Sequence, residues 1–294
     1  MQNIESKLGK ISIILPAKNE AEGLSLVLPR LKTIYPDAEI IVVDDGSSDR
    51  TAEVCDFLQV FRIFHHYSKG NGAAIKTGLR RATGDIVVCM DADGQHRPED
   101  IHILLDKMAQ GYDMVVGARR RSGQASGHRG LANAFYNRLA SWMVGQQVDD
   151  LTSGFRAMRR LLVEEFISLL PNGFSYPTTT TMCFFRAGYS VAYVPVDVQQ
   201  RLAGTQSHIR LIRDGIRFLM IIFKIGTLFS PLKIFLPISG SLFLLGLGYY
   251  LYTFIEYSRF TNMSALLFTT SIMVFLMGLV SEQITNLLYS RAGE

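Results

Sequence analysis

The sequence has few cysteines, and the three that it has, Cys55, Cys89 and Cys183, are scattered. Their spacing fits neither a metal site nor a disulfide framework, so we predict reduced core residues of a cytosolic domain. A dense Lys/Arg run with interleaved aromatics is missing before residue 200. The net charge of +4 therefore favours a phosphate-bearing ligand or an anionic membrane surface over nucleic acid. The polar segment 1–10 predicts no signal peptide.

Charged residues are absent from two long stretches, 234–255 and 260–281. Each is long enough to cross a hydrocarbon core of about 30 Å, and the short link 256–259 predicts a transmembrane hairpin. Two buried core helices are the weaker interpretation, because nothing downstream would cover them. Lys and Arg crowd before the first stretch and Arg291 follows the second. The positive-inside rule therefore predicts a cytoplasmic-membrane protein with both termini and the preceding domain in the cytoplasm.

The segment 209–229 combines basic residues with a heavily apolar face. This pattern predicts an amphipathic helix in the membrane interface, and the alternative is a helix docked on the preceding domain. We therefore expect three parts: a cytoplasmic domain over 1–208, a juxtamembrane helix over 209–230, and a hairpin with a short tail over 231–294. The hairpin could also support a homo-oligomer.

Short apolar runs alternate with helical periodicity from Lys10 to about Gly117. Because the runs are apolar on both faces, they predict an α/β fold with a mostly parallel, Rossmann-like sheet and helices on both faces. The expected strands are 11–15, ended by Pro16, then 39–43, 60–64, 85–90, 114–117 and 191–196. The expected helices are 20–35, one from about 51, 72–82, 98–110 and one ending near 144.

Polar clusters follow four of these strands. Ligands bind at the carboxyl ends of strands in such sheets, so we expect the clusters to meet in one crevice. They are 16–20, 44–47, 91–95 and 118–121. Asp44 and Asp45 could accept hydrogen bonds from a nucleobase or from ribose hydroxyls. The Gly-rich run 69–74 matches neither a Walker loop nor the dinucleotide-binding motif.

Asp91 and Asp93 are two residues apart, directly after an apolar strand. Residues at this spacing point to the same side of a strand. With the amide of Gln95 they could present oxygen ligands to a hard cation that bridges two phosphates of a nucleotide. A solvated acidic turn is the alternative interpretation.

Four segments, in this order and spacing, resemble inverting glycosyltransferases of family 2 with the GT-A fold: Pro16–Glu20, Val42–Asp49, Lys69–Gly84 and Met90–His96. The segment Asp150–Arg156 and the hairpin narrow the resemblance to the polyprenyl-phosphate glycosyltransferases, the dolichol-phosphate mannose synthase-like group. The resemblance implies an inverting transfer of one sugar from a UDP- or GDP-linked donor to undecaprenyl or dolichyl phosphate.

The resemblance also implies roles for particular residues. Asp91, Asp93 and Gln95 would hold Mg²⁺ or Mn²⁺. Asp150 would be a base or an orienting carboxylate, or would instead pair with Arg156 structurally. The base and ribose pocket would be lined by Pro16, Lys18, Glu20, Val43 and Asp45. The lipid and donor phosphates would be gathered by Arg119, Arg129 and Arg201, with help from Ser207.

One departure from the family pattern concerns position 208, where His follows Ser207 and the family usually has Lys. A histidine loses its charge above a pKa of about 6.5, so a permanent cation is missing there unless Arg210 replaces it.

Two other functions remain open. A processive polysaccharide synthase would need a Gln-x-x-Arg-Trp signature, which the chain lacks. A catalytically dead membrane scaffold is disfavoured by the intact acidic motif. The sequence does not identify the sugar.

Overall fold

The computed structural model describes residues 8–119, 127–173, 175–199, 220, 223, 226–228 and 230–290, without side chains for 127–133 and 288–290. The chain divides into two compact units, Met1–Ile209 and Arg210–Glu294. The juxtamembrane helix expected over 209–230 lies mostly outside the described residues.

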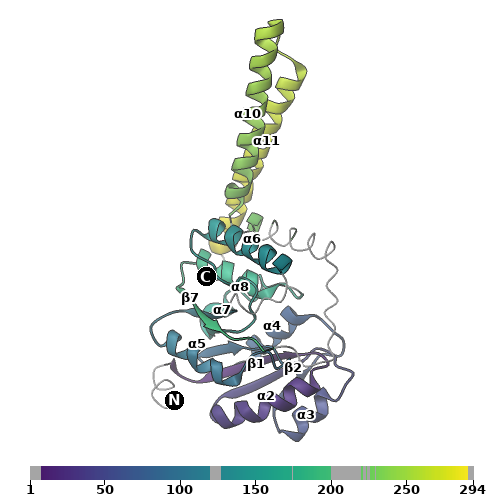
Figure 1. The fold of residues 1–294 in the computed structure, drawn as a ribbon, viewed down its shortest axis with the longest axis vertical. Coiled ribbons are helices and arrows are strands. Elements are labelled where there is room, and N and C mark those ends of the chain that lie inside the picture. The colour runs from purple at the N-terminus through teal and green to yellow at the C-terminus, as the bar shows by residue number, and fades with distance from the viewer. Residues whose placement is uncertain are drawn as a thin grey trace. The chain divides into compact units, whose positions relative to one another are not determined.

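Among the described residues, a seven-stranded sheet forms the framework of the N-terminal unit (Figure 1). The spatial order is β3-β2-β1-β4-β6-β5-β7, and every neighbouring pair is parallel except the two that involve β6. The prediction of a mostly parallel α/β sheet is therefore confirmed. The strands are Ile11–Ala17 (β1), Glu39–Asp44 (β2), Phe61–Phe64 (β3), Ile86–Cys89 (β4), Met114–Arg119 (β5), Arg156–Arg159 (β6) and Val191–Val196 (β7).

Strand β1 runs through Pro16, so the prediction that this proline ends the strand is wrong. The carbonyl of Ala17 accepts a hydrogen bond from the amide of Asp45, which shows that Ala17 bonds toward β2. Because alternate residues bond to opposite neighbours, Pro16 turns its nitrogen toward β4. The pairing with β4 ends at Ile14, so the missing N–H costs no ladder bond. The chain after Cys89 leaves the sheet at the same point.

Strand β6 is the largest departure from the expected strand order. It lies between β4 and β5, antiparallel to both, and Arg156 is in register with Cys89 and Val116. A four-residue run with arginine at each end does not predict a strand inside a buried sheet, yet the Arg156 side chain is fully buried. The insertion places the loop that precedes β6 between the carboxyl ends of β4 and β5.

Helices cover both faces of the sheet (Figure 1). On one face, the apolar side of α2 (Ala21–Ile34) and α5 (Ile101–Met108) shares a buried cluster with Ile13 and Leu15 of β1. On the other face, Gly78 of α4 (Asn71–Arg81) lies so close to Ile14 that a Cβ would overlap its side chain. The shorter elements are α3 (Thr51–Phe57), η1 (Pro98–Asp100), α6 (Gly127–Val144), α7 (Arg160–Glu164) and α8 (Tyr176–Arg186).

From residue 230 onward, the described part of the C-terminal unit forms two contacting helices, α10 (Pro231–Tyr257) and α11 (Asn262–Ser290). Both are long and apolar enough to cross a membrane. The hydroxyls of Ser239 and Ser271 each donate to the other residue's carbonyl oxygen, at 2.9 Å, and tie the helices together. The second helix begins later than 260, because the Thr261 hydroxyl accepts from the Ser264 amide and caps it.

Substituting Gly23 tests how closely α2 packs against the acidic segment that follows β4. A Cβ on this buried α2 residue would overlap the backbone carbonyl of Ala92. We expect Gly23→Ala to push this backbone outward and to destabilise the domain by about 1–3 kcal/mol, as overpacking does. Gly173→Ala is the control, because a Cβ there meets nothing within 4 Å. Thermal unfolding monitored by circular dichroism measures both, and equal unfolding temperatures would contradict the close packing.

Candidate active site

Three neighbouring parallel strands, β2, β1 and β4, end at one edge of the sheet. Ala17 is in register with Asp44, and Ile14 with Cys89, so the segments that follow emerge side by side. A cavity of about 320 Å³ opens there. Its lining contains six of the residues expected to bind the donor or a metal. The full lining is Pro16, Ala17, Lys18, Glu20, Asp45, Ser68, Gly70, Asn71, Ala74, Asp91, Ala92 and Asp93.

The acidic segment after β4 is held in a tight turn. The Asp93 carboxylate accepts from the Gln95 amide at 3.1 Å, and Gly94 between them has a φ of +73°. The Gln95 side chain donates to the carbonyl of Gln199 at 3.3 Å. The structure therefore brings Asp91 and Asp93 to the cavity, while Gln95 is outside its lining and is tied to the segment after β7.

The donor atoms in the cavity suit a hard divalent cation. Carboxylate oxygens are the ligands that Mg²⁺ and Mn²⁺ prefer, and Mg²⁺ commonly takes only one or two of them together with substrate phosphates. No group of three His, Cys, Asp or Glu side chains within the described residues could hold a metal alone. The residues present therefore fit a cation that is completed by a bound diphosphate, with Asp91 and Asp93 as the protein ligands.

Asp45 is buried, and both of its oxygens are already occupied. Oδ1 accepts from His65 Nδ1 at 2.7 Å and from the Lys69 amide at 2.8 Å. Oδ2 accepts from the Ser68 hydroxyl at 2.7 Å and from the Gly70 amide at 2.8 Å. Burial alone would raise the pKa of Asp45, but these four hydrogen bonds outweigh it and lower the pKa to about 2. The carboxylate thus shapes the loop that forms one wall of the cavity.

Asp44 has a different environment from its neighbour. Its side chain is buried, pairs with Arg62 at 3.2 Å and accepts from the Ser47 amide at 2.8 Å. It does not line the cavity. Of the two carboxylates that the sequence offered as acceptors for a base or a ribose, only Asp45 reaches the site.

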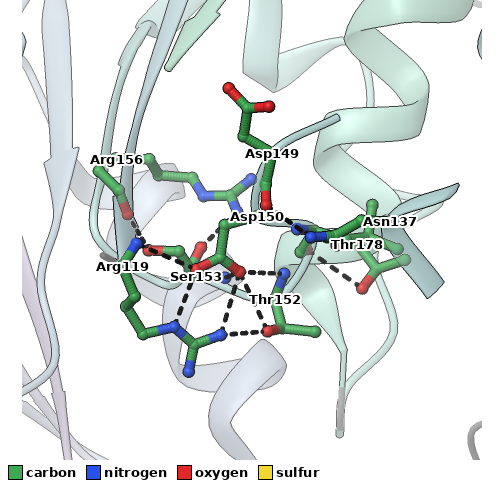
Figure 2. Close-up of polar contacts among 10 residues, drawn as sticks. Arg119, Asn137, Asp149, Asp150, Thr152, Ser153, Arg156 and Thr178 are labelled. Atoms are coloured by element: carbon green, nitrogen blue, oxygen red, sulfur yellow. Dashed lines mark hydrogen bonds and ion pairs between the residues drawn. The ribbon is translucent and has the colours of Figure 1, made fainter. Parts of the chain in front are cut away.

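A second charged group, Arg119 with Asp150, lies at the end of β5 (Figure 2). Arg119 Nε and Nη2 donate to the two oxygens of Asp150 at 2.8 and 3.0 Å. Nη2 also donates to the Thr152 hydroxyl at 2.5 Å, and Asp150 accepts from the amides of Thr152 and Ser153. Within the described residues Nη1 has no hydrogen-bond partner, so the guanidinium keeps donors for a phosphate oxygen.

The charges of this pair stabilise each other. Burial alone would raise the pKa of Asp150, but the hydrogen bond and charge of Arg119 lower it below the usual value. Burial alone would lower the pKa of Arg119, but Asp150, and to a lesser extent Asp91, raise it. An ionised carboxylate that accepts six hydrogen bonds is a weak base, so the geometry favours an orienting role for Asp150.

Asp150 does not pair with Arg156, so that alternative is wrong. The Arg156 guanidinium is fully buried beside α8, where Nη1 donates to the Pro177 carbonyl at 2.9 Å and to the Thr181 hydroxyl at 3.2 Å, and Nη2 donates to the Ser153 carbonyl. These contacts join β6 to the start of α8. They hold in place the loop that carries Asp150.

Several expected site residues lie elsewhere or outside the described residues. Val43 is fully buried within β2 and does not line the cavity. Arg129 belongs to α6, but its side chain is outside the described set, as are Arg201, Ser207 and His208. Ser68, Asn71 and Ala74 also line the cavity, although no role was predicted for them individually. Their only signal in the sequence is the Gly-rich run 69–74, which contains Asn71 and Ala74 and directly follows Ser68.

Two models of known protein families match this chain. The model of glycosyl transferase family 2 matches residues 12–167, over half of the chain, and a model described as the GtrB C-terminal hairpin matches residues 230–287. The chain belongs to glycosyl transferase family 2. The family predicted from the sequence motifs is therefore confirmed.

Curated relatives are similar over about three fifths of this chain. A polyprenol monophosphomannose synthase of Mycolicibacterium smegmatis is 33% identical over 208 residues, covering 65% of this chain and 78% of that protein. An undecaprenyl-phosphate 4-deoxy-4-formamido-L-arabinose transferase of Proteus mirabilis is 34% identical over 191 residues. That alignment covers 58% of each chain, so this chain matches less than two thirds of that relative's length.

Solved structures confirm the fold class. Glucosyl-3-phosphoglycerate synthase of Mycobacterium tuberculosis, in complex with Mn²⁺ and UDP-glucose, superimposes with a TM-score of 0.60. The match covers 75% of this chain and 82% of that one at 24% identity. A complex of the same enzyme with Mn²⁺, UDP and phosphoglyceric acid gives a TM-score of 0.57 at 22% identity, covering 69% and 74%. At this level of identity the likeness establishes the fold alone.

The lowered pKa of Asp45 predicts an effect on stability in acid. Because its folded-state pKa of about 2 lies below the ordinary aspartate value of 3.8, the ionised carboxylate stabilises the fold above about pH 4. This contribution, about 2 kcal/mol, is lost as the pH falls through 2. We expect Asp45→Asn to unfold at a lower temperature than the wild type at pH 5, with a smaller difference near pH 2.

Asp37→Asn, at an exposed carboxylate, is the control for this measurement. Its unfolding temperature should follow the wild type at both pH values. If the Asp45→Asn and wild-type temperatures stayed separated by the same amount from pH 5 to pH 2, the carboxylate would not be the titrating group.

Proposed function

We propose that the protein is an inverting glycosyltransferase that moves one sugar from a nucleotide-sugar to a polyprenyl phosphate. The observation that carries the proposal is the cavity where β1, β2 and β4 end, which Asp45, Asp91 and Asp93 line. Such a cavity fits a diphosphate with its cation and the nucleoside attached to it.

The relatives support the choice of acceptor. One is a polyprenol monophosphomannose synthase, and another is a transferase named for undecaprenyl phosphate. The match of residues 230–287 to a hairpin model adds a segment suited to a lipid acceptor. Glucosyl-3-phosphoglycerate synthase binds UDP and Mn²⁺, which supports a nucleotide donor and a divalent cation but leaves UDP against GDP, and Mg²⁺ against Mn²⁺, open.

Donor binding follows from the cavity walls. Pro16, Lys18 and Glu20 line the cavity and would contact the base and ribose. A nucleobase N–H that reached Asp45 would have to replace one of its four donors. The Ser68 hydroxyl is the most easily replaced, because it can rotate away, whereas the backbone amides of the loop are fixed.

The reaction needs little help from a base. An oxygen of the acceptor phosphate, already anionic at neutral pH, attacks the anomeric carbon while the bond to the donor diphosphate breaks, and the electron pair leaves with the diphosphate oxygen. A divalent cation held by Asp91 and Asp93 would offset the charge on that diphosphate. A single in-line displacement inverts the anomeric centre, so an α-linked donor gives a β-linked product. The chain's own contribution is positioning and charge stabilisation.

Arg119 is proposed to bind a phosphate with the donors that Asp150 leaves open. Asp150 then acts as a positioning residue that fixes the guanidinium, and not as the proton acceptor. Arg129, Arg201 and Ser207 remain proposed ligands of the lipid and donor phosphates. With His208 they form the part of the proposal that rests on the sequence alone.

Membrane attachment is proposed to come from the C-terminal hairpin. The helices α10 and α11 meet the length and hydropathy expected of membrane spans, and most of their apolar side chains are exposed. With Lys and Arg flanking both ends of the pair, the catalytic unit and both termini would lie on the cytoplasmic face of the inner membrane.

Two other functions make different predictions for the same assay. A processive synthase would build a polymer, and a dead scaffold would transfer nothing. We propose to incubate the purified full-length protein with undecaprenyl phosphate, Mn²⁺ or Mg²⁺, and a panel of UDP- and GDP-sugars, and to analyse the lipid extract by mass spectrometry. One sugar added per lipid phosphate supports the proposal. A polymer, or no product from a broad panel with either metal, overturns it.

Asp93→Asn tests the proposed cation ligand. The change keeps the side-chain shape but removes a charge from the cavity, so we expect at least a 10²-fold loss of metal-dependent transfer. Asp106→Asn, at an exposed carboxylate of α5, should retain wild-type activity. Initial rates at increasing Mn²⁺ measure both variants, and an Asp93→Asn enzyme with wild-type rates and metal dependence would reassign the site.

A double-mutant cycle tests whether Asp150 acts through Arg119. Arg119→Lys loses the bidentate geometry and Asp150→Asn loses the charge, so each should lower kcat roughly 10²-fold. If Asp150 only orients Arg119, the double variant should be no slower than the slower single variant. The measurement is the transfer rate at saturating substrates. Losses that multiply, together with a missing acidic limb in the pH profile of Asp150→Asn, would make Asp150 a base.

A further inference from the structure

His65 occupies a buried position between Asp45, which lines the proposed donor cavity, and helix α4. It directly follows β3, and only 4% of its surface is exposed. Its Nδ1 lies 2.7 Å from Asp45 Oδ1, and its Nε2 lies 2.9 Å from the Thr77 hydroxyl on α4. The imidazole therefore joins the end of β2 to the middle of α4 through both ring nitrogens.

The direction of these hydrogen bonds follows from the charge of Asp45. A carboxylate ionised down to pH about 2 only accepts hydrogen bonds, so His65 Nδ1 carries the hydrogen. In the neutral ring Nε2 is then the acceptor, and the Thr77 hydroxyl donates to it. Both contacts hold the ring in one tautomer and one orientation.

Asp45 connects His65 to the loop that lines the cavity. The same oxygen that His65 contacts also accepts from the Lys69 amide, and the second oxygen accepts from Ser68 and Gly70. Gly70 has a φ of +101° and leads directly into α4 at Asn71. Ser68, Gly70 and Asn71 line the cavity, whereas His65 does not, so the histidine would affect a ligand indirectly, through the loop that Asp45 holds.

We infer that His65 is a positioning residue for the donor nucleotide: it fixes Asp45, which fixes the Ser68–Asn71 wall against which the nucleoside diphosphate binds. This inference rests on the proposed function, which makes the cavity the donor site. Its consequence is that His65 controls nucleotide affinity without contacting the nucleotide. The turnover of bound substrates and the affinity for the lipid phosphate should change little.

The two amide side chains that mimic histidine allow a specific test. The amide nitrogen of an asparagine lies near the place of Nδ1, and that of a glutamine lies near the place of Nε2. His65→Asn therefore keeps a donor for Asp45, and His65→Gln removes it. His66→Gln is the matched control, because the adjacent His66 is exposed and its ring packs edge-on against Phe64.

The binding experiment is titration calorimetry of the full-length protein in detergent with UDP and with GDP, each with Mn²⁺. We expect His65→Gln to weaken binding of the preferred nucleotide about tenfold or more, the effect of losing a hydrogen bond to a charged group. His65→Asn should recover most of this loss, and His66→Gln should match the wild type. In the transfer assay, His65→Gln should raise the KM for the nucleotide-sugar while kcat changes less than about threefold.

Amide hydrogen exchange provides a readout that does not depend on activity. In His65→Gln the Lys69 and Gly70 amides should exchange faster than in the wild type, while amides in β1 should be unchanged. Circular dichroism confirms that the variant is folded.

The outcomes distinguish failure of the proposed function from failure of the positioning role of His65. If the wild type binds neither nucleotide, the proposed function fails and this inference fails with it. If the wild type binds but folded His65→Gln binds equally well, the positioning role alone is overturned. The same holds if His65→Asn and His65→Gln lose affinity equally, or if kcat falls with an unchanged KM.

Discussion

The parallel register of β2, β1 and β4 is the constraint on which the site depends. Because parallel strands present their carboxyl ends at one edge, residues that are far apart in the chain emerge within one cavity. Pro16 contributes to this arrangement by offering no N–H toward β4. The segment that begins at Asp91 can therefore leave the sheet while β1 continues to Ala17. The acidic segment thus stands beside the loop that Asp45 organises.

The carboxylates around this edge differ by what already bonds to them. Asp45 and Asp150 are buried and accept several backbone and side-chain donors, which keeps them ionised and makes them organisers of loops. Asp44 is paired with Arg62 and does not line the cavity. Asp91 and Asp93 line the cavity together with Asp45. Asp91 and Asp93 are the proposed cation ligands, while the hydrogen bonds of Asp45 and Asp150 hold the neighbouring loops in place.

The sequence predicts the elements of this fold better than it predicts their contacts. Local periodicity and apolar runs identify β1 to β5, β7 and the main helices, and the Asp-x-Asp spacing places Asp91 and Asp93 correctly at the cavity. Strand β6 is missed because burying Arg156 requires acceptors from α8, which local pattern cannot reveal. The saturation of Asp45 is missed for the same reason, since His65 reaches it from the end of another strand.

Arg156 illustrates how a buried charge can serve a site that it does not contact. Among the described residues it has no carboxylate partner, and its guanidinium is held by neutral acceptors, the carbonyls of Ser153 and Pro177 and the hydroxyl of Thr181. Burying a charge without hydrogen bonds is costly, so these three contacts tie the loop before β6 to α8, although Arg156 Nε has no hydrogen-bond partner among the described residues. Gly154 in that loop lies so near the acidic segment that a Cβ would be 3.0 Å from Asp91 Oδ2. The buried Arg156 guanidinium thereby holds the loop that lies between the Arg119–Asp150 pair and the proposed metal site.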